Sequence, residues 1–236
     1  MRAPEVLTWL RRNGSRRVRD GMARYGIVAA RACGVTMGEL QGLRKPIGTD
    51  HALALALWDS GIYEARLLAA LVGDPARLTV RQMNAWAAGF ENWADCDTAC
   101  MHLFDRSPHA WGRARVWAKS RHEFVKRGGF ALMASLALHD KGAADARFLA
   151  FLPLVEQGAT DERHVVSKGV NWALRGIGRR NPTLHAAALA LARRLAQATA
   201  TAPRRLGKDA ARELSSPKVV ARLARRPTAT RSARAR

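Results

Sequence analysis

The sequence predicts an all-α protein built as an α-solenoid, and three observations support this fold class. Apolar residues recur at helical spacing along most of the chain from residue 22 onward. No stretch combines sustained apolar and polar alternation with β-branched residues, so we expect essentially no sheet. Intervals of 35, 34 and 45 residues separate Trp58, Trp93, Arg127 and Trp172, which stand in similar helical contexts. Such intervals are close to the length of one helical-hairpin repeat, which favours a solenoid over a bundle.

Capping residues and prolines divide the chain into helices. Thr36 and Thr79 each precede an acidic or amide residue by three positions, which is the spacing of a capping box. Asn181 stands before a proline, as a cap before the first helical residue does. The neighbourhood of Pro153 is expected to be a connector. The expected helices cover residues 22–32, 37–45, 50–59, 62–72, 79–88, 91–105, 108–118, 121–139, 144–152, 161–180 and 182–200, with short pieces near 208–214 and 217–224.

The net charge of the chain is +21, and the excess is concentrated at its two ends. Residues 1–20 carry six Arg against two acids, and residues 203–236 carry 11 basic against two acidic groups. An excess of this size indicates nucleic acid or another acidic surface as partner. We expect a basic, partly helical lead-in over 1–20, one solenoid domain over 21–216 and an Arg-rich, disordered tail over 217–236. The tail either adds non-specific DNA affinity or is a solvated tail without a defined role.

Cysteine usage and hydropathy bear on location, metals and cofactors. Three cysteines suit a reducing compartment, and Cys96 and Cys100 are one helical turn apart, which is poor geometry for a disulfide. No signal peptide and no apolar run of about 20 residues is visible, so we expect a cytoplasmic protein without a membrane partner, associated with the nucleoid through DNA binding. We also expect a monomer. Cys96, Cys100 and His102 lack a fourth ligand at sensible spacing. We therefore expect neither a metal nor a cofactor.

The stretch from residue 91 to residue 100 holds the first candidate for chemistry. Trp93 and Asp97 are four residues apart and share one helix face, beside an apolar stripe. Taken singly, Trp93 is more typical of a core residue and Asp97 of a surface charge. Asp95 points away from Asp97 on a helix, so no pair of catalytic carboxylates is present. The apolar stripe is formed by Cys96, Ala99, Cys100 and Leu103.

A second tryptophan, Trp172, stands within a cationic stripe. Lys168, Arg175 and Arg179 lie on its helix face at i−4, i+3 and i+7. A tryptophan in such surroundings is typical of contact with a sugar, a base or an acidic partner. The opposite face is expected to be buried and consists of Val166, Val170, Ala173 and Ile177.

Arg127 is the third candidate, with Lys126 beside it and two glycines following. We interpret Arg127 as a phosphate ligand, because the glycines allow a close approach of the backbone. The alternative is a surface arginine that pairs with Glu123 at i−4.

A single carboxylate suffices for glycosidic cleavage only when the leaving group is already activated. A purine alkylated at N3 or N7 carries a positive charge and leaves as a neutral base. The sugar then becomes oxocarbenium-like, and a carboxylate near C1′ stabilises it and orients water. Aromatic faces add cation–π stabilisation.

The sequence resembles the AlkD-like DNA alkylation repair family from Met22 to about Leu214. This resemblance implies a HEAT-like solenoid with a basic concave groove that binds double-stranded DNA containing alkylated purines. It implies Asp97 as catalytic carboxylate, Trp93 and Trp172 as sugar-facing tryptophans, and Arg127 as phosphate ligand. It also implies excision of N3- and N7-alkylpurines without base flipping. The segments that carry it are 22–27, 56–59 with 64–66, 92–97, 123–127 and 170–175.

Two other functions remain open at this point. The first is a non-catalytic HEAT-like protein that binds bent, branched or damaged DNA with the same basic face. The second is a HEAT-type protein-interaction scaffold, which predicts little salt-dependent affinity for DNA.

Asn92 departs from the pattern of the AlkD-like family, because some family members have a second aromatic residue beside the first tryptophan.

Overall fold

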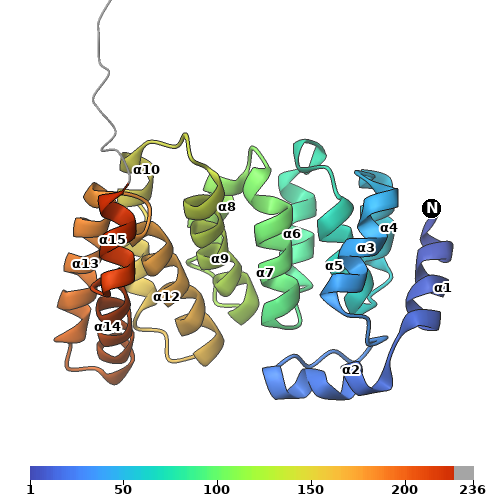
Figure 1. Ribbon diagram of the computed structural model, residues 1–236, viewed down its shortest axis with the longest axis horizontal. Helices are drawn as coiled ribbons and strands as arrows, with labels where there is room; N and C mark the ends of the chain where they lie inside the picture. The colour runs from blue at the N-terminus through green and yellow to red at the C-terminus, as the bar shows by residue number, and fades with distance from the viewer. Residues whose placement is uncertain (226–236) are drawn as a thin grey trace, which may run out of the picture. The chain divides into compact units, whose positions relative to one another are not determined.

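The computed structural model describes residues 1–225, which form α-helices and short 3-10 helices without a strand among them (Figure 1). This confirms the all-α prediction. The chain divides into two compact units, Met1–Leu132 and the part from Met133 onward. Helix α9 (Glu123–His139) carries the boundary between them. No helix within residues 1–225 has the length and apolarity needed to cross a membrane.

The first unit is organised around α5, which packs against α3, α4 and α7. Its aromatic core lies between the neighbouring helices, where Trp58 stacks on Trp86 with ring centroids 4.2 Å apart. The elements that precede α9 are α1 (Ala3–Asn13), α2 (Arg16–Gly21), η1 (Met22–Tyr25), α3 (Met37–Ile47), α4 (His51–Asp59), α5 (Tyr63–Val72), η2 (Pro75–Arg77), α6 (Val80–Ala88), α7 (Trp93–His102), η3 (Phe104–Arg106) and α8 (Ala110–Trp117).

The N-terminal segment forms helices α1 and α2, and α1 packs into the core of the first unit. Val6 and Leu10 of α1 are fully buried, and α1 contacts α4 and α5. Helix α2, in contrast, buries no side chain and runs crosswise to α3, α5 and α7 (Figure 1). The segment expected as a basic lead-in therefore closes one end of the apolar core.

The expected helix over 22–32 is wrong. Residues 22–25 form the 3-10 helix η1, and Gly26 ends it in the left-handed conformation with φ of 67°. A residue with positive φ cannot continue a right-handed helix. None of the η1 side chains is buried, so no packing stabilises a longer helix. The chain then runs without regular structure to Thr36, where the predicted capping box with Glu39 begins α3.

The second unit contains α10 (Asp145–Leu149), α11 (Leu152–Gly158), α12 (His164–Gly178), α13 (Pro182–Ala196), α14 (Thr201–Leu214) and α15 (Pro217–Ala224). Helices α12, α13 and α14 pack against one another. The predicted apolar face of α12 is confirmed, because Val166, Val170, Ala173 and Ile177 are all fully buried. Gly207 marks a close approach of α14 to α13, since a Cβ there would lie 2.3 Å from the Ala196 backbone nitrogen.

Three expectations for the second unit need correction. Pro153 lies in the first turn of α11 instead of a connector, and Pro203 lies in the first turn of α14, which therefore begins earlier than expected. A proline is compatible with the first turn, where the backbone N–H groups have no intrahelical partner. Residues 217–224 form α15, which confirms the short helix expected there and contradicts the assignment of these residues to a disordered tail. The rest of that tail, residues 226–236, lies outside the described residues.

Candidate active site

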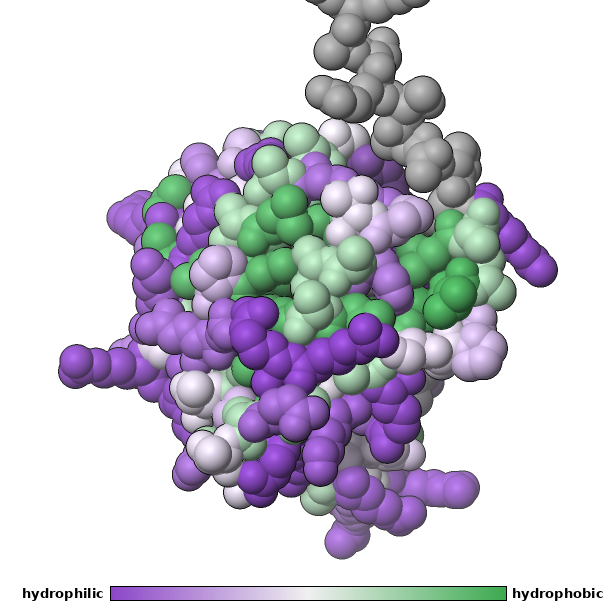
Figure 2. Space-filling view, turned by 90° about the vertical axis from the view of Figure 1, so that its left-hand side faces the viewer, coloured by the Kyte–Doolittle hydropathy of each residue, from purple (hydrophilic) through white to green (hydrophobic). Residues whose placement is uncertain are grey.

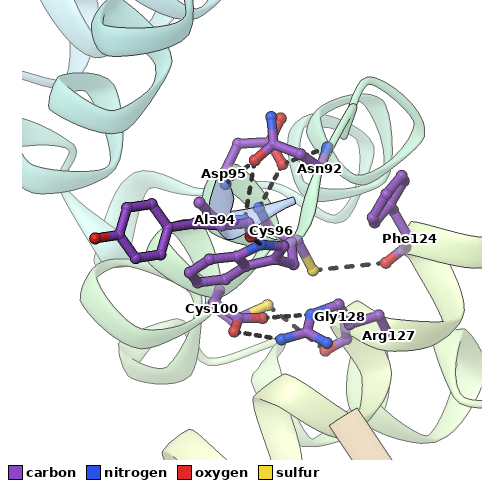
Figure 3. Close-up of polar contacts among 11 residues, drawn as sticks. Asn92, Ala94, Asp95, Cys96, Cys100, Phe124, Arg127 and Gly128 are labelled. Carbon is purple, nitrogen blue, oxygen red and sulfur yellow. Dashed lines mark hydrogen bonds and ion pairs between the residues drawn. The ribbon is translucent and has the colours of Figure 1, made fainter. Parts of the chain in front are cut away.

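A network of hydrogen bonds holds the start of α7. The Asn92 side-chain oxygen accepts the N–H groups of Ala94 and Asp95 at 2.9 and 3.2 Å. The Asp95 carboxylate accepts the N–H groups of Asn92, Glu91 and Cys96 in return (Figure 3). This is a capping box, which satisfies the free donors of the first turn. Burial raises the pKa of Asp95 to about 6, against the effect of these donors.

The capped turn presents Trp93 to a cleft of about 720 Å³ in the first unit. The Trp93 indole N–H donates to the backbone oxygen of Tyr25 at 2.8 Å, which ties η1 to α7. Tyr25 itself is 73% exposed. Tyr25 was not predicted as a site residue, although it lines this cleft together with Tyr63, Trp93 and Asp97. The cleft thus combines aromatic walls with one carboxylate.

Asp97 forms a bidentate ion pair with Arg127. The Arg127 Nε and Nη2 groups donate to the two Asp97 carboxylate oxygens at 2.9 and 2.7 Å. The side chains are 8% exposed for Arg127 and 19% for Asp97. Burial raises the pKa of Asp97, and the hydrogen bonds from Arg127 oppose this effect. Although burial disfavours the guanidinium charge, the bonds to Asp97 raise the pKa of Arg127.

Close packing of α9 against α7 and α8 brings Arg127 opposite Asp97. The Cys96 and Cys100 thiols donate to the backbone oxygens of Phe124 and Gly128, each at 3.5 Å (Figure 3). Burial raises the pKa of both thiols, so they remain protonated donors. A Cβ at Gly129 would lie 2.3 Å from the Ala118 backbone nitrogen, so only glycine allows this approach of α9 to α8.

The structure contradicts the alternative interpretation of Arg127 as a surface arginine, whereas its interpretation as a phosphate ligand stays a prediction. Arg127 is buried, not at the surface, and it binds a carboxylate located 30 residues earlier in the chain. Its neighbour Lys126 is half-buried on the same helix. No spacing rule within one helix connects Arg127 to Asp97, since the pair joins two different helices.

The other predicted site residues belong to the second unit. Trp172 is half-buried on α12, and Lys168 is exposed four residues before it. Arg175 and Arg179 both pair with Glu213 of α14. Two of the three cations in the predicted stripe thus share one carboxylate. Glu213 was not among the predicted site residues, because it lies 38 residues after Arg175 on another helix.

The cleft in the first unit can stabilise a positive charge that develops in a substrate. Asp97 supplies one negative charge whose ionisation Arg127 favours, and Trp93 supplies an aromatic face beside it. Fixed groups of this kind act most strongly where the surroundings partly exclude water. Within residues 1–225, no group of three or more His, Cys, Asp and Glu side chains is arranged to hold a metal ion.

Comparisons with known proteins agree with this architecture. A family model described as "DNA alkylation repair enzyme" matches residues 6–214. A similar solved structure comes from "a new family of proteins related to the HEAT-like repeat DNA glycosylases with affinity for branched DNA structures". The similarity has a TM-score of 0.74 and 19% identity, and it covers 90% of this chain and 95% of the other. At this identity it concerns the fold, and it confirms the predicted HEAT-like repeat architecture. No curated protein matches the chain.

Proposed function

The chain belongs to the DNA alkylation repair enzyme family, and on this premise we propose that it is a DNA glycosylase. Its proposed reaction is hydrolysis of the N-glycosidic bond of cationic N3- and N7-alkylated purines in duplex DNA. The observation that carries this proposal is the buried Asp97–Arg127 pair at the wall of an open, aromatic cleft. Such a site offers one stabilised carboxylate, which suits a substrate whose base needs no general acid.

The proposed reaction follows from the charge of the lesion. The bond between C1′ and the purine nitrogen breaks, and its electron pair neutralises the positive base as it leaves. The deoxyribose becomes an oxocarbenium ion, which the Asp97 carboxylate stabilises. Water then adds its oxygen to C1′ and loses one proton to the solvent, with Asp97 orienting it. Stabilisation of about 3 kcal/mol from such a group corresponds to roughly a hundredfold in rate.

Arg127 serves the same reaction by keeping Asp97 ionised and by fixing the direction of its two oxygens. Lys126 and Arg127, whose side chain is 8% exposed, are proposed to contact a backbone phosphate. In the second unit, Trp172 is proposed to pack against deoxyribose, with Lys168, Arg175 and Arg179 as phosphate contacts. No cofactor takes part in this mechanism. The absence of base flipping and the concave groove implied by the family resemblance stay predictions.

The decisive experiment measures base release from duplex DNA that carries N7-methylguanine or N3-methyladenine. The variant Asp97→Asn keeps the shape of the side chain and removes its charge, so we expect release to fall about a hundredfold or more. Asp59→Asn is the matched control, because Asp59 is exposed at the end of α4, outside the cleft. Normal release by Asp97→Asn would refute the assigned role of the carboxylate.

A second candidate function is non-catalytic binding of branched DNA. One observation favours it, namely that the similar solved structure comes from a family with affinity for such DNA. This function predicts binding of a four-way junction at least as tight as binding of a linear duplex, with no base release above the spontaneous rate. Under this alternative, Asp97→Asn leaves the affinity for either DNA unchanged.

A further inference from the structure

A hollow of about 440 Å³ lies between α12 and α14 in the second unit, and its lining is strongly cationic. The face of the second unit that shows α13, α14 and α15 is hydrophilic in its lower half and more hydrophobic in its upper half (Figure 2). On α14, Arg205, Lys208 and Arg212 follow at i, i+3 and i+7, so they share one helix face. Five basic side chains line the hollow, namely Lys168, Arg204, Arg205, Lys208 and Arg212.

Asp209 is the acidic residue of this lining, and its charge is already taken up. Its carboxylate accepts hydrogen bonds from Arg212 and from the Asn171 amide, each at 2.5 Å. Arg204 is also engaged, because its guanidinium donates to the backbone oxygen of Thr199 at 2.6 Å. Three cations are left over. Within the described part of the chain, no hydrogen bond or ion pair engages the side chains of Lys168, Arg205 and Lys208.

A buried acceptor at the same place supports a ligand site. Asn171 is 6% exposed and lines the hollow, and its carbonyl oxygen has no hydrogen-bond partner within residues 1–225. Buried polar groups without a partner are rare in folded proteins. A water molecule held by an anion can donate one hydrogen to this oxygen and another to the anion. The hollow thus offers direct cationic contacts and one water-mediated contact.

The two ends of α12 differ in the cations that they leave available. Arg175 and Arg179 share Glu213, which reduces the positive charge at their end. Lys168 lies at the other end, beside the free cations of α14. An adjoining hollow beyond Lys168 and Arg205 carries the exposed Glu162, which marks where the cationic lining ends.

We infer that the hollow between α12 and α14 is the main phosphate-binding site of the second unit, with Lys168, Arg205 and Lys208 as ligands of a DNA backbone phosphate. This inference rests on the DNA binding in the proposed function and deepens it, because it adds named residues of α14 to the DNA contacts. Among the proposed contacts of this unit, it makes the Lys168 end of α12 the main one and the Arg175–Arg179 end a weaker one.

The test compares double variants that each remove two positive charges. Arg205→Gln/Lys208→Gln is the pocket variant, and Arg193→Gln/Lys218→Gln is the control, since both control residues are exposed and lie outside the hollow. Affinity for an undamaged duplex is measured over a range of salt concentrations. Loss of one or two phosphate contacts lowers the log–log salt slope by about 1 to 2. We expect this loss, with roughly tenfold weaker binding, in the pocket variant alone.

Arg175→Gln/Arg179→Gln provides a third arm. A smaller loss of affinity in this variant than in the pocket variant supports the inference, and the opposite order overturns it. Equal losses in the pocket and control variants would also overturn it, because they would indicate a general effect of net charge. All variants change exposed or half-exposed side chains, and circular dichroism checks that each remains folded.

A further arm separates a DNA phosphate from free phosphate. Inorganic phosphate is titrated at constant ionic strength, and its binding is followed by calorimetry. If the pocket variant loses phosphate binding but keeps full affinity for the duplex, the hollow serves a free anion and the DNA assignment is wrong. Because these arms use undamaged DNA, they do not depend on base release. Failure of the glycosylase proposal and failure of this inference are therefore distinguishable.

Discussion

Asp97 in the first unit and Glu213 in the second unit both bind guanidinium groups, but in different ways. Asp97 receives two hydrogen bonds from one arginine, in a pair whose side chains are 8% and 19% exposed. Glu213 is shared by Arg175 and Arg179, whose side chains are 27% and 42% exposed. In the first arrangement a buried carboxylate binds one arginine. In the second, a half-buried carboxylate, 25% exposed, is shared by two more exposed arginines.

This difference distinguishes the carboxylate that we propose as reactive from one that neutralises two arginines. A buried bidentate pair holds its carboxylate in one orientation at the edge of a cleft, and removal of the arginine leaves an unpaired charge. Glu213 is itself 25% exposed and binds two arginines, so its charge stays paired with one arginine when the other is removed. The three predictions that follow test this comparison.

The largest effect is expected from Arg127→Gln. Because this change leaves Asp97 buried without a cation, we expect the free energy of unfolding to fall by about 3 kcal/mol. Arg175→Gln makes the same change in the Glu213 network, and we expect a loss below about 1 kcal/mol. Chemical denaturation of both variants measures the two values. Similar losses would show that the two networks do not differ in the way described.

The second prediction concerns the pH dependence of base release. Burial raises the pKa of Asp97 above its ordinary value of 3.8, and the reaction needs the charged form. The rate should therefore fall as the pH decreases, up to tenfold per pH unit below the pKa of Asp97. Arg127→Gln removes the hydrogen bonds that lower this pKa, so the decline should begin at higher pH.

Single-turnover release between pH 4.5 and 8, corrected for spontaneous depurination, measures this profile. The Asp59→Asn variant should follow the unaltered protein. If the rate of base release begins to fall at the same pH in Arg127→Gln as in the unaltered protein, this result would contradict the role of Arg127 in keeping Asp97 ionised. The free energy of unfolding depends on pH in the opposite direction. A raised pKa of Asp97 in the folded state favours folding at low pH, and this contribution is lost as the pH rises through that pKa.

The smallest effect is expected from Glu213→Gln. This change releases Arg175 and Arg179 from their shared carboxylate, so we expect undamaged duplex to bind about two- to threefold more tightly, with a salt slope steeper by about 1. Base release from saturated complexes should not change. Fluorescence anisotropy at several salt concentrations provides the measurement. Weaker binding in this variant would indicate that Glu213 positions the two arginines for DNA.

Periodicity within single helices was sufficient to predict much of the fold. The apolar face of α12 and the capping boxes at Thr36 and Thr79 depend on residues three or four positions apart, and all are present in the structure. The failed helix over 22–32 shows the limit of this reasoning. Gly26 has the backbone freedom for a left-handed turn, but periodicity alone does not reveal that the turn is used there.

Partners on different helices were not predictable from the sequence. Asp97 and Arg127 were each selected as site residues, but their pairing joins α7 to α9 across 30 residues. Glu213 likewise neutralises a stripe that looks free when α12 is considered alone. The helix expected near 208–214 begins too late, because α14 starts at Thr201, and Arg205 was left outside it. Such contacts depend on how the helices pack, which one sequence does not specify.

If the protein is a glycosylase as proposed, the contact of α9 with α8 at Gly129 has a consequence for how this activity can be lost during evolution. A single added methyl group at this position meets the backbone of Ala118 and not a movable side chain, so one of the two helices has to shift. Arg127, two positions earlier, would then move relative to Asp97. A descendant chain could thus retain every residue of the candidate site and still be inactive. Position 129 therefore belongs among the residues compared when a catalytic lineage is traced.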